Sequence, residues 1–390
     1  MNESTTVPSP SSSRPSTAGE PLRLVVAAGG TGGHIFPAIA TLEALRSTGP
    51  LDVTWIGGAN GFEARIATQH GIPFHAIPVG KLRRYVAWQT IPDAVRIPLG
   101  ILKAWRLLGH IKPDVVLSTG GYASVPTVVA ARLRRVPVLT HEQTVTVGLA
   151  TKINARVADV VALSWPSSAA GVGKPRGEVI VTGNPLRALI ANGDANRGRK
   201  SFGLPAALPL LYATGGIQGA TSINRSIIDN LPALLEHVVI VHQCGSLTER
   251  DDVAALRGAS SSLPAALANR YRQRETLGDE VGDVLAAAAL VVARSGAGTI
   301  AELAATGTPS ILVPLPGADE QRRNARLLAD AGAAMVIPDE EMTGERLRST
   351  IESLLADPAQ LARMSAAARS LAQDAPAERL ASAIRALASR

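Results

Sequence analysis

LRLVVAAGGTGGH, residues 22–34, is an apolar run that leads directly into a glycine-rich turn. A strand that ends in such a turn is typical of α/β domains, where glycines let the chain turn closely into a helix. The N–H groups at the start of that helix favour an anion such as a diphosphate. The stretch therefore predicts a strand, a phosphate-facing turn and a helix, in that order.

Three more apolar runs end in the same way. Residues 114–118 lead into Thr119-Gly120-Gly121-Tyr122, residues 208–214 into Gly215-Gly216-Ile217-Gln218-Gly219-Ala220, and residues 290–293 into Arg294-Ser295-Gly296-Ala297-Gly298-Thr299. The first and third turns are almost as far apart as the second and fourth. This spacing indicates one α/β unit used twice.

The rest of the chain supports two α/β domains. Strand-like runs alternate with helix-like stretches such as 37–47 and 124–133, which predicts parallel sheets wrapped by helices. The expected strands are 22–28, 53–56, 74–77, 115–118, 136–140, 159–163 and 179–182 in the first half, and 208–214, 238–242, 290–293, 310–314 and 334–337 in the second. A length of 390 residues also suits two cores better than one.

The predicted organisation has four parts. Residues 1–20 form a disordered Ser/Pro/Thr-rich tail, 21–184 a first Rossmann-like domain and 185–365 a second one. Gly183-Asn184-Pro185 begins the hinge between them, because Gly, Pro and Asn interrupt the pattern there. Residues 366–390 form a C-terminal helix, and the break at Ala375-Pro376 allows it to pack back on the first domain.

Composition excludes several classes. A single cysteine rules out an intramolecular disulfide, and no apolar run is long enough to span a bilayer. Lys and Arg outnumber Asp and Glu by about two to one in residues 21–184 and nearly balance them in 185–365. The basic first half indicates an anionic partner there, such as a membrane surface, a phosphorylated substrate or nucleic acid.

The glycine turns do not fit the common nucleotide fingerprints. The first turn lacks the G-x-G-x-x-G spacing, and the second strand ends Trp55-Ile56-Gly57-Gly58 without the carboxylate that NAD binding needs. Gly171-Val172-Gly173-Lys174 is followed by proline, so it is not an ATPase phosphate loop. No Cys/His spacing resembles a zinc site. A nucleotide diphosphate between two similar domains remains.

The ordered motifs resemble the MurG glycosyltransferases of family 28. The matches, in order, are Gly29-Gly30-Thr31-Gly32-Gly33-His34-Ile35-Phe36-Pro37, Gly80-Lys81-Leu82-Arg83-Arg84-Tyr85, Lys112-Pro113-Asp114-Val115-Val116, Gly120-Gly121-Tyr122-Ala123-Ser124-Val125-Pro126, His141-Glu142-Gln143, Gly183-Asn184-Pro185-Leu186-Arg187, Arg294-Ser295-Gly296-Ala297 and Gln321-Arg322-Arg323-Asn324-Ala325. The resemblance implies the twin-Rossmann glycosyltransferase-B fold. It also implies inverting transfer of N-acetylglucosamine from UDP-GlcNAc to undecaprenyl-linked lipid I, giving lipid II for peptidoglycan.

The resemblance also implies site residues. The donor-binding set is Thr31, Gly32, Gly33, Thr144, Arg187, Ile217, Gly278, Ala297, Gly298, Thr299, Ile300, Ala301, Glu302, Gln321 and Asn324. Acceptor contacts fall on Gly121, Tyr122, His141 and Glu142, and no obligatory metal or other cofactor is implied. Three positions depart from the family pattern: Thr144 replaces a frequent Asn, Ile217 a usual Ser and Ala289 a common Asp.

Glu302 and His34 carry the chemical prediction. Glu302 follows Gly296 by six residues, so its carboxylate can accept hydrogen bonds from ribose hydroxyls while the helix start meets the phosphates. A carboxylate that merely favours the helix dipole is the alternative. His34, in the first helical turn, can act as the base that an inverting transfer needs. A histidine that caps the helix or binds the diphosphate is the alternative.

The other candidates each have a structural alternative. His141 and Glu142 could instead be a structural hydrogen-bonding pair at a strand end, and Arg187 could form a hinge salt bridge. Gln321 and Asn324, three residues apart on one helix face, could bind sugar hydroxyls or lie on a solvated face.

Residues 81–106 are the predicted membrane face. The stretch contains Leu82, Arg83, Arg84, Tyr85 and Trp88, followed by Lys103, Trp105 and Arg106. Basic residues mixed with aromatics suit an anionic bilayer surface; ordinary packing of Trp88 and Trp105 in a core is the alternative. The family places such an enzyme peripherally on the cytoplasmic face of the bacterial cell membrane, with other cell-wall synthesis proteins as possible partners.

Three functions are therefore compatible with the sequence. The first is the lipid I transferase, the second a related transferase with another glycolipid or secondary-metabolite acceptor, and the third a non-catalytic binding protein. The basic half has few aromatics for base stacking, so nucleic acid is disfavoured.

Overall fold

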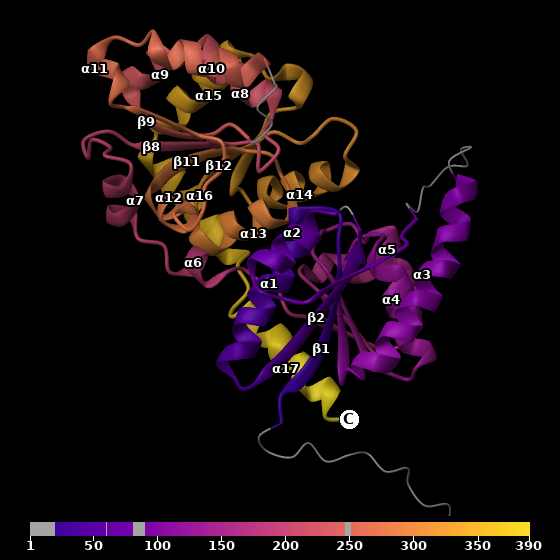
Figure 1. Cartoon of the computed structure of the whole chain (residues 1–390). Coiled ribbons are helices and arrows are strands. Elements are labelled where there is room, and N and C mark those ends of the chain that lie inside the picture. Colours follow the sequence, from indigo (N-terminus) through magenta and orange to yellow (C-terminus); the bar gives the residue numbers. More distant parts are fainter. Residues whose placement is uncertain (1–19, 60, 81–89, 246–250) are drawn as a thin grey trace, which may run out of the picture.

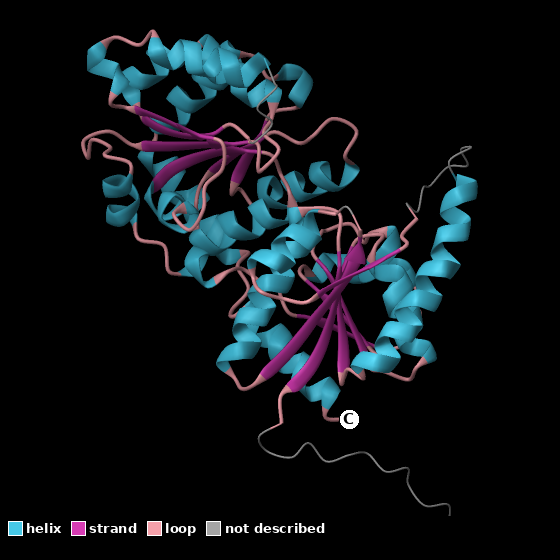
Figure 2. Cartoon of the chain, viewed as in Figure 1, coloured by secondary structure: helices cyan, strands magenta, loops and turns pink. Residues whose placement is uncertain are grey.

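The structure, a computed structural model, describes residues 20–59, 61–80, 90–245 and 251–390. These residues form two α/β domains that meet along one edge (Figure 1). The predicted N-terminal tail lies almost wholly outside the described residues. Each domain has a parallel sheet with helices on both faces (Figure 2).

The sheet of the first domain has seven strands within the described residues, in the order β3-β2-β1-β4-β5-β6-β7. Their bounds are β1 Leu22–Ala28, β2 Leu51–Gly58, β3 Phe74–Ile77, β4 Val115–Gly120, β5 Val138–Glu142, β6 Val160–Leu163 and β7 Glu178–Val181. Every residue of β4 and β5 is buried. Continuous burial is what a parallel strand covered on both faces requires, and it explains the unbroken apolar runs in the sequence.

Helices cover both faces of this sheet. They are α1 Gly32–Ser47, α2 Phe62–Gln69, α3 Thr90–Ile111, α4 Ser124–Leu133 and α5 Leu149–Ala155, with a 3₁₀ turn η1 at Pro166–Gly171. Helix α1 begins five residues before the helix expected from residue 37, because the glycine turn itself supplies the first helical turn.

The second domain repeats the pattern with six strands in its described residues, ordered β10-β9-β8-β11-β12-β13. The strands are β8 Leu210–Thr214, β9 Val239–Gln243, β10 Tyr271–Arg274, β11 Ala288–Ala293, β12 Ser310–Leu312 and β13 Ala334–Val336. The helices from the link onward are α6 Ala188–Ala191, α7 Ala195–Ser201, α8 Thr221–Asp229, α9 Leu231–His237, α10 Asp251–Ser261, α11 Ala265–Ala268, α12 Val281–Ala287, α13 Ala297–Thr306, α14 Asp319–Asp330, η2 Asp339–Glu341, α15 Gly344–Leu355, α16 Pro358–Ser370 and α17 Pro376–Ala388.

Each sheet reverses its strand order once. The chain first builds outward from β1 to β3, then returns to β4 on the other side of β1; β8 and β11 do the same in the second domain. The turns that leave two such neighbouring strands diverge to opposite faces and open a crevice at their carboxyl ends. All four glycine turns found in the sequence lie at these two reversal points.

Two glycine turns of the first domain touch through their backbones. Gly121 has a φ of +77°, and a Cβ there would lie 2.1 Å from the carbonyl oxygen of Gly29. No other residue type tolerates both conditions, because the first strains an L side chain and the second leaves no room for one. This contact brings the ends of β1 and β4 together beneath the crevice.

The twelve predicted strands all exist, with ends displaced by a few residues, but β10 was missed. Its sequence, YRQR, is too polar for the apolar pattern used to find strands. Only Tyr271 is buried, because β10 is an edge strand with one neighbour, β9.

The C-terminal helix crosses back to the first domain. Leu380, Ala381 and Ile384 of α17 are buried in the same core cluster as residues of β1 and α1 (Figure 1). Arg385 adds hydrogen bonds from Nη2 to the carbonyl oxygen of Leu45, at 2.9 Å, and from Nε to Oγ1 of Thr48, at 2.7 Å. The boundary expected at residue 366 falls inside α16, which packs on α13; the crossing helix begins at Pro376, after Ala375 with a φ of +44°.

Replacing Leu380 with Ala tests whether α17 is part of the first core. We expect Leu380→Ala to lower the free energy of unfolding by about 2–5 kcal/mol, because a fully buried leucine leaves a cavity. Leu133→Ala is the matched control, since that leucine is 64% exposed and should change stability by less than about 0.5 kcal/mol. Equal urea denaturation midpoints for the two variants would contradict this packing.

Candidate active site

The two sheets present their carboxyl edges to one another across the domain interface. Helices α1 and α13 are in contact there, and Nδ2 of Asn184 donates to the carbonyl oxygen of Ala297 at 3.3 Å. The first and third glycine turns face each other, since a Cβ on Gly32 would lie 3.6 Å from Cδ1 of Ile217. The predicted diphosphate-facing turns are thus brought together from both domains.

His34 lies at the start of α1, half-buried at this interface. Its Nδ1 lies 2.9 Å from the carbonyl oxygen of Thr119 and 3.0 Å from Oε1 of Gln143. The hydroxyl of Thr119 in turn donates to the backbone oxygen of His34 at 2.6 Å. The second glycine turn therefore holds the imidazole. Nδ1 is engaged by Thr119 and Gln143, and Nε2 lies on the opposite side of the ring.

Glu302 occupies the second turn of α13, and its side chain is half-buried. Burial raises the pKa of Glu302, while the positive charge of Arg187 acts in the opposite direction. The helix begins after Gly296, which has no side chain that could cap the first N–H groups. A carboxylate and a helix N-terminus thus lie on one element, as a ribose and a diphosphate require.

Arg187 connects the two halves of the interface. Its guanidinium carbon lies 5.0 Å from the ring centroid of Phe36 on α1, and its charge acts on Glu302 of α13. A cation–π contact fixes the guanidinium without neutralising it, so the positive charge stays available to an anion. This position fits the predicted contact to a diphosphate better than a hinge salt bridge.

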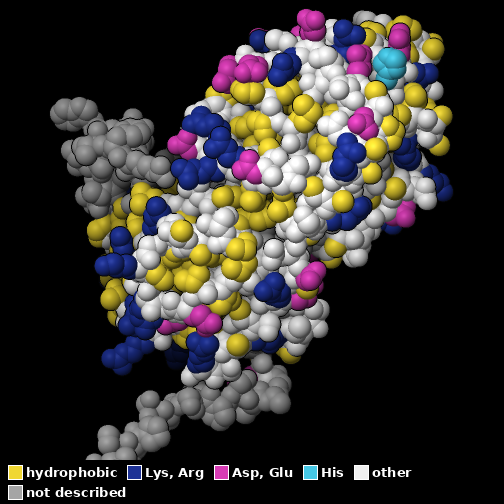
Figure 3. Space-filling view, turned by 180° about the vertical axis from the view of Figure 1, so that it is seen from behind, with side chains coloured by type: hydrophobic (Ala, Val, Ile, Leu, Met, Phe, Trp, Pro, Cys, Tyr) yellow, Lys and Arg dark blue, Asp and Glu magenta, His cyan; other side chains and the backbone are white. Residues whose placement is uncertain are grey.

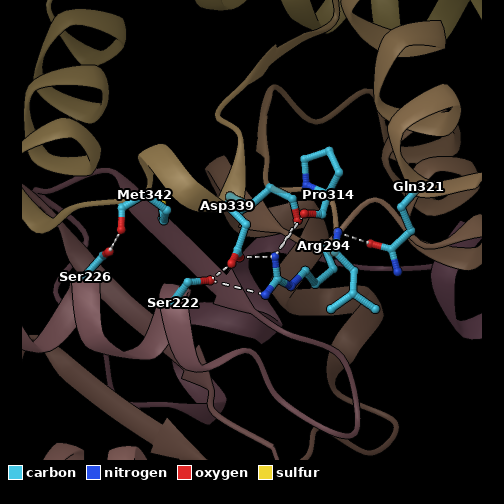
Figure 4. Close-up of polar contacts among 9 residues, drawn as sticks. Ser222, Ser226, Arg294, Pro314, Gln321, Asp339 and Met342 are labelled. Atoms are coloured by element: carbon cyan, nitrogen blue, oxygen red, sulfur yellow. Dashed lines mark hydrogen bonds and ion pairs between the residues drawn. The ribbon is translucent and has the colours of Figure 1, made fainter. Parts of the chain in front are cut away.

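Arg294 holds the carboxyl edge of the second sheet together (Figure 4). Its Nη1 donates to Asp339 at 2.5 Å and to the carbonyl oxygens of Val313 and Pro314 at 3.1 and 3.2 Å, while Nη2 donates to Ser222 at 3.2 Å. The guanidinium thereby ties the start of α8 to the ends of β11 and β12. Its role is support, because both of its terminal nitrogens donate to the protein.

Gln321 and Asn324 do share one face of α14, as their spacing predicts. Oε1 of Gln321 accepts from the backbone N–H of Leu315 at 3.0 Å (Figure 4). Asn324 is buried: Nδ2 donates to the carbonyl oxygen of Ser295 at 3.0 Å and Oδ1 accepts from Val145 of the first domain at 3.3 Å. Asn324 thus joins the domains, and of the two amides Gln321 is the more accessible to a sugar.

His141 and Glu142 lie below the crevice and not in it. Both side chains are buried in β5. Glu142 accepts hydrogen bonds from the backbone N–H groups of Thr144 and Gly148, at 3.2 and 2.9 Å, and from the hydroxyl of Thr144 at 2.8 Å. Burial lowers the pKa of His141 to about 4, so this ring is neutral near pH 7. The predicted direct contact with an acceptor does not fit this burial, and we assign both to supporting the loop that begins at Gln143.

The remaining predicted positions lie around the same crevice. Gly121 and Tyr122 border the first glycine turn, since a Cβ on Gly30 would lie 3.7 Å from Cε1 of Tyr122. Gly278 lies in the loop that leaves β10, where Leu277 donates to Oε1 of Gln243 at 3.2 Å. Thr31, Gly33 and residues 297–301 line the two opposing helix starts.

Two supporting residues, Glu63 and Gln143, were not predicted from the sequence. Glu63 of α2 is 1% exposed, and its carboxylate accepts from the N–H groups of Gly30 at 3.2 Å and Gly58 at 3.1 Å. Nothing in its local sequence distinguishes it from a surface glutamate. Gln143 stands in a quoted motif, but no role was given to it; its spacing from His34 is too long to suggest contact.

The predicted membrane residues Leu82, Arg83, Arg84, Tyr85 and Trp88 lie outside the described residues. The adjoining part of α3 is described: Leu99, Leu102 and Trp105 are 52%, 45% and 40% exposed, and Lys103 and Arg106 are exposed beside them. Trp105 is therefore not in the core. Apolar and basic side chains alternate on this part of the first domain (Figure 3).

Two features are absent from the described residues. No helix within them is long and apolar enough to cross a bilayer. No group of three or more His, Cys, Asp or Glu side chains in the same residues could hold a metal ion.

Comparison with known families identifies the class. Residues 24–163 match the glycosyltransferase family 28 N-terminal domain, and residues 210–381 match the glycosyltransferase family 28 C-terminal domain. The chain therefore belongs to glycosyltransferase family 28, as its motifs indicated.

Relatives within this family carry one name. A protein of Desulforudis audaxviator is 37% identical over 359 residues, covering 90% of this chain and 94% of its own length. A protein of Treponema denticola is 36% identical over 331 residues, covering 82% of this chain and 84% of its own length. Both are named UDP-N-acetylglucosamine–N-acetylmuramyl-(pentapeptide) pyrophosphoryl-undecaprenol N-acetylglucosamine transferase.

Solved structures confirm the glycosyltransferase-B fold. The crystal structure of Acinetobacter baumannii MurG superposes with a TM-score of 0.71 at 30% identity, covering 94% of this chain and all of that one. An Anabaena protein, HepE, solved with UDP and glucose, shares the fold at 17% identity with a TM-score of 0.56.

Glu302→Ala tests the donor-binding prediction. We expect UDP affinity to fall by about 3 kcal/mol, because two hydrogen bonds to a charged group are lost. Glu345→Ala, at an exposed position in the first turn of α15, is the matched control and should leave affinity unchanged. Titration calorimetry with UDP measures both variants; equal dissociation constants for Glu302→Ala and wild type would refute a ribose contact.

Proposed function

We propose that this chain transfers N-acetylglucosamine from UDP-GlcNAc to undecaprenyl-pyrophosphoryl-MurNAc-pentapeptide, with inversion at the anomeric carbon. The observation that carries the proposal is the likeness of nearly the whole chain to transferases named for that reaction. The site supports it with groups suited to a nucleotide diphosphate on one domain and a histidine on the other.

The donor is held by the second domain in this proposal. The start of α13 and Arg187 face the diphosphate of UDP. Glu302 faces the ribose, and the loop at Gly278 faces the uracil base. As the bond from the anomeric carbon to the diphosphate oxygen breaks, negative charge grows on UDP. Helix N–H groups and a fixed guanidinium stabilise that charge without having to reorganise.

The acceptor approaches from the first domain. Its hydroxyl oxygen forms a bond to the anomeric carbon on the face opposite the leaving UDP, and its proton passes to Nε2 of His34. Because Nδ1 of His34 is engaged by Thr119 and Gln143, Nε2 is the nitrogen left to receive the proton. Gly121 and Tyr122 border the acceptor side.

The direct test is incubation with radiolabelled UDP-GlcNAc and lipid I. The proposal predicts labelled lipid II and an equal amount of released UDP. UDP release with another glycolipid from a panel, but not with lipid I, would favour the related transferase. Binding of UDP-GlcNAc without any transfer would leave only a binding role.

His34→Ala separates a base from a phosphate ligand. We expect kcat to fall about a hundredfold or more, with little change in the dissociation constant of UDP-GlcNAc, because only proton transfer is removed. His70→Ala, at an exposed position after α2, controls for loss of a histidine. If donor affinity falls in step with rate, His34 binds the diphosphate and the base lies elsewhere.

The lipid acceptor implies that the enzyme works at a membrane, and the α3 face is the proposed contact. Arg134 stacks on Trp105, with its guanidinium carbon 3.8 Å from the ring centroid, and Leu133 nearby is 64% exposed. Exposed apolar groups among cations suit an interface in which rings enter the headgroup layer and cations meet anionic lipid.

Changing Arg83, Arg84, Lys103 and Arg106 to Ser tests this face. We expect release from phosphatidylglycerol vesicles at low salt, since each cation contributes about 1 kcal/mol near an anionic surface. Activity on a short-chain, water-soluble acceptor should survive. The matched control changes four arginines of the second domain, of which Arg257, Arg346 and Arg363 are exposed and Arg348 is half-buried. Co-sedimentation of both variants to the same extent would contradict the assignment.

A further inference from the structure

Gln143 lies between two histidines and contacts both. It follows the last residue of β5 and is 1% exposed. Its Oε1 lies 3.0 Å from Nδ1 of His34; its Nε2 lies 2.8 Å from the carbonyl oxygen of Thr119 and 3.0 Å from Nδ1 of His141. A buried amide with both ends engaged is costly to disturb, because a lost partner leaves a polar atom unpaired.

The partners of His34 determine which of its nitrogens carries the proton. The oxygen of Thr119 is a carbonyl and can only accept, so Nδ1 of His34, 2.9 Å away, must be the donor. The atom of Gln143 that faces this N–H must then be the accepting oxygen. Nε2 of His34 is left with its lone pair, on the side of the ring away from these acceptors.

His141 gives an independent constraint on the same amide. Its Nε2 lies 3.0 Å from the carbonyl oxygen of Gly183, so Nε2 is protonated and Nδ1 bears the lone pair. That lone pair requires a donor, which the NH₂ group of Gln143 provides. Both histidines therefore demand the same orientation of the amide, although either one alone would fix it.

The series of hydrogen bonds from His34 through Gln143 and His141 ends at Gly183, between the two domains. Gly183 has a φ of +86°, and a Cβ on it would lie 2.6 Å from Cβ of Gln373, so it is closely held where the chain leaves the first domain. Burial keeps His141 neutral near pH 7, so this end of the chain does not change its protonation in the working range.

We infer that Gln143 is a positioning residue, which holds the His34 ring in the Nδ1–H form with the Nε2 lone pair turned toward the acceptor. The series His34–Gln143–His141–Gly183 anchors the base to the interdomain connection. The inference rests on the proposed function for its kinetic consequence alone; the protonation pattern of the ring is a property of the protein without substrate.

Gln143→Met removes the hydrogen bonds and keeps the length of the side chain. We expect kcat to fall about 10–100-fold with the KM for UDP-GlcNAc within about twofold, a size seen when a group that orients a reactive ligand is lost. Gln273→Met is the matched control, since this partly buried glutamine lies on β10 and donates to Cys244. It should keep wild-type kinetics.

Gln143→Glu distinguishes positioning from general support of the fold. The substituted carboxylate still accepts from Nδ1–H of His34, but it stabilises the protonated ring, which cannot act as a base. The acid limb of the pH profile of kcat/KM should therefore move to higher pH. If Gln143→Met does not fold, this variant alone decides the kinetic question. Wild-type kinetics in both variants, or a rise in KM with kcat unchanged, would overturn the inference.

Nitrogen-15 NMR of the histidine rings tests the protonation pattern without substrate. The His34 signals, assigned by their loss in His34→Ala, should show a protonated Nδ1 and a bare Nε2 in wild type, and exchange between two forms in Gln143→Met. A protonated Nε2 in wild-type protein would overturn the inference, whatever its activity. If the ring is as predicted but no transfer from UDP-GlcNAc occurs, the proposed function fails instead.

Discussion

The reversal of strand order at β1/β4 and at β8/β11 is the constraint on which the site depends. Neighbouring parallel strands that send their chains to opposite faces leave a crevice at their carboxyl ends. Glycine is needed there because backbones meet, as at Gly121 and the carbonyl of Gly29. The helices that start in the crevice aim N–H groups into it, so anion binding follows from the topology before any side chain is considered.

The proposed function gives this geometry a different purpose in each domain. The second domain adds a carboxylate at Glu302 and an arginine, Arg294, that ties the strand ends together. The first adds a neutral polar assembly around His34, in which carbonyl and amide groups outnumber charges. The carbonyl of Thr119 and the amide of Gln143 engage Nδ1 of His34 and leave Nε2 for a proton, whereas a diphosphate needs hydrogen-bond donors and positive charge. In the proposed function, the second domain therefore binds the UDP-sugar donor and the first domain binds the acceptor.

Much of the fold and part of the candidate site were predictable from the sequence, because these features depend on local patterns. Buried parallel strands give apolar runs, and glycine turns mark where they end, so the fold and the position of His34 and Glu302 could be inferred. Edge strand β10 could not, since one exposed face and one neighbour allow polar residues. Burial of His141, Glu142 and Asn324, and the contacts of Glu63 and Gln143, depend on segments distant in sequence, which no local pattern encodes.

Amide hydrogen exchange with and without ligand tests the central claim, that one donor is enclosed by both glycine-rich edges. UDP alone should slow exchange at the start of α13, near residues 297–302. UDP-GlcNAc should in addition slow exchange at the first turn of α1, near residues 32–35, because the sugar reaches toward the other domain. Protection confined to the second domain with both ligands, or protection away from both helix starts, would contradict the account.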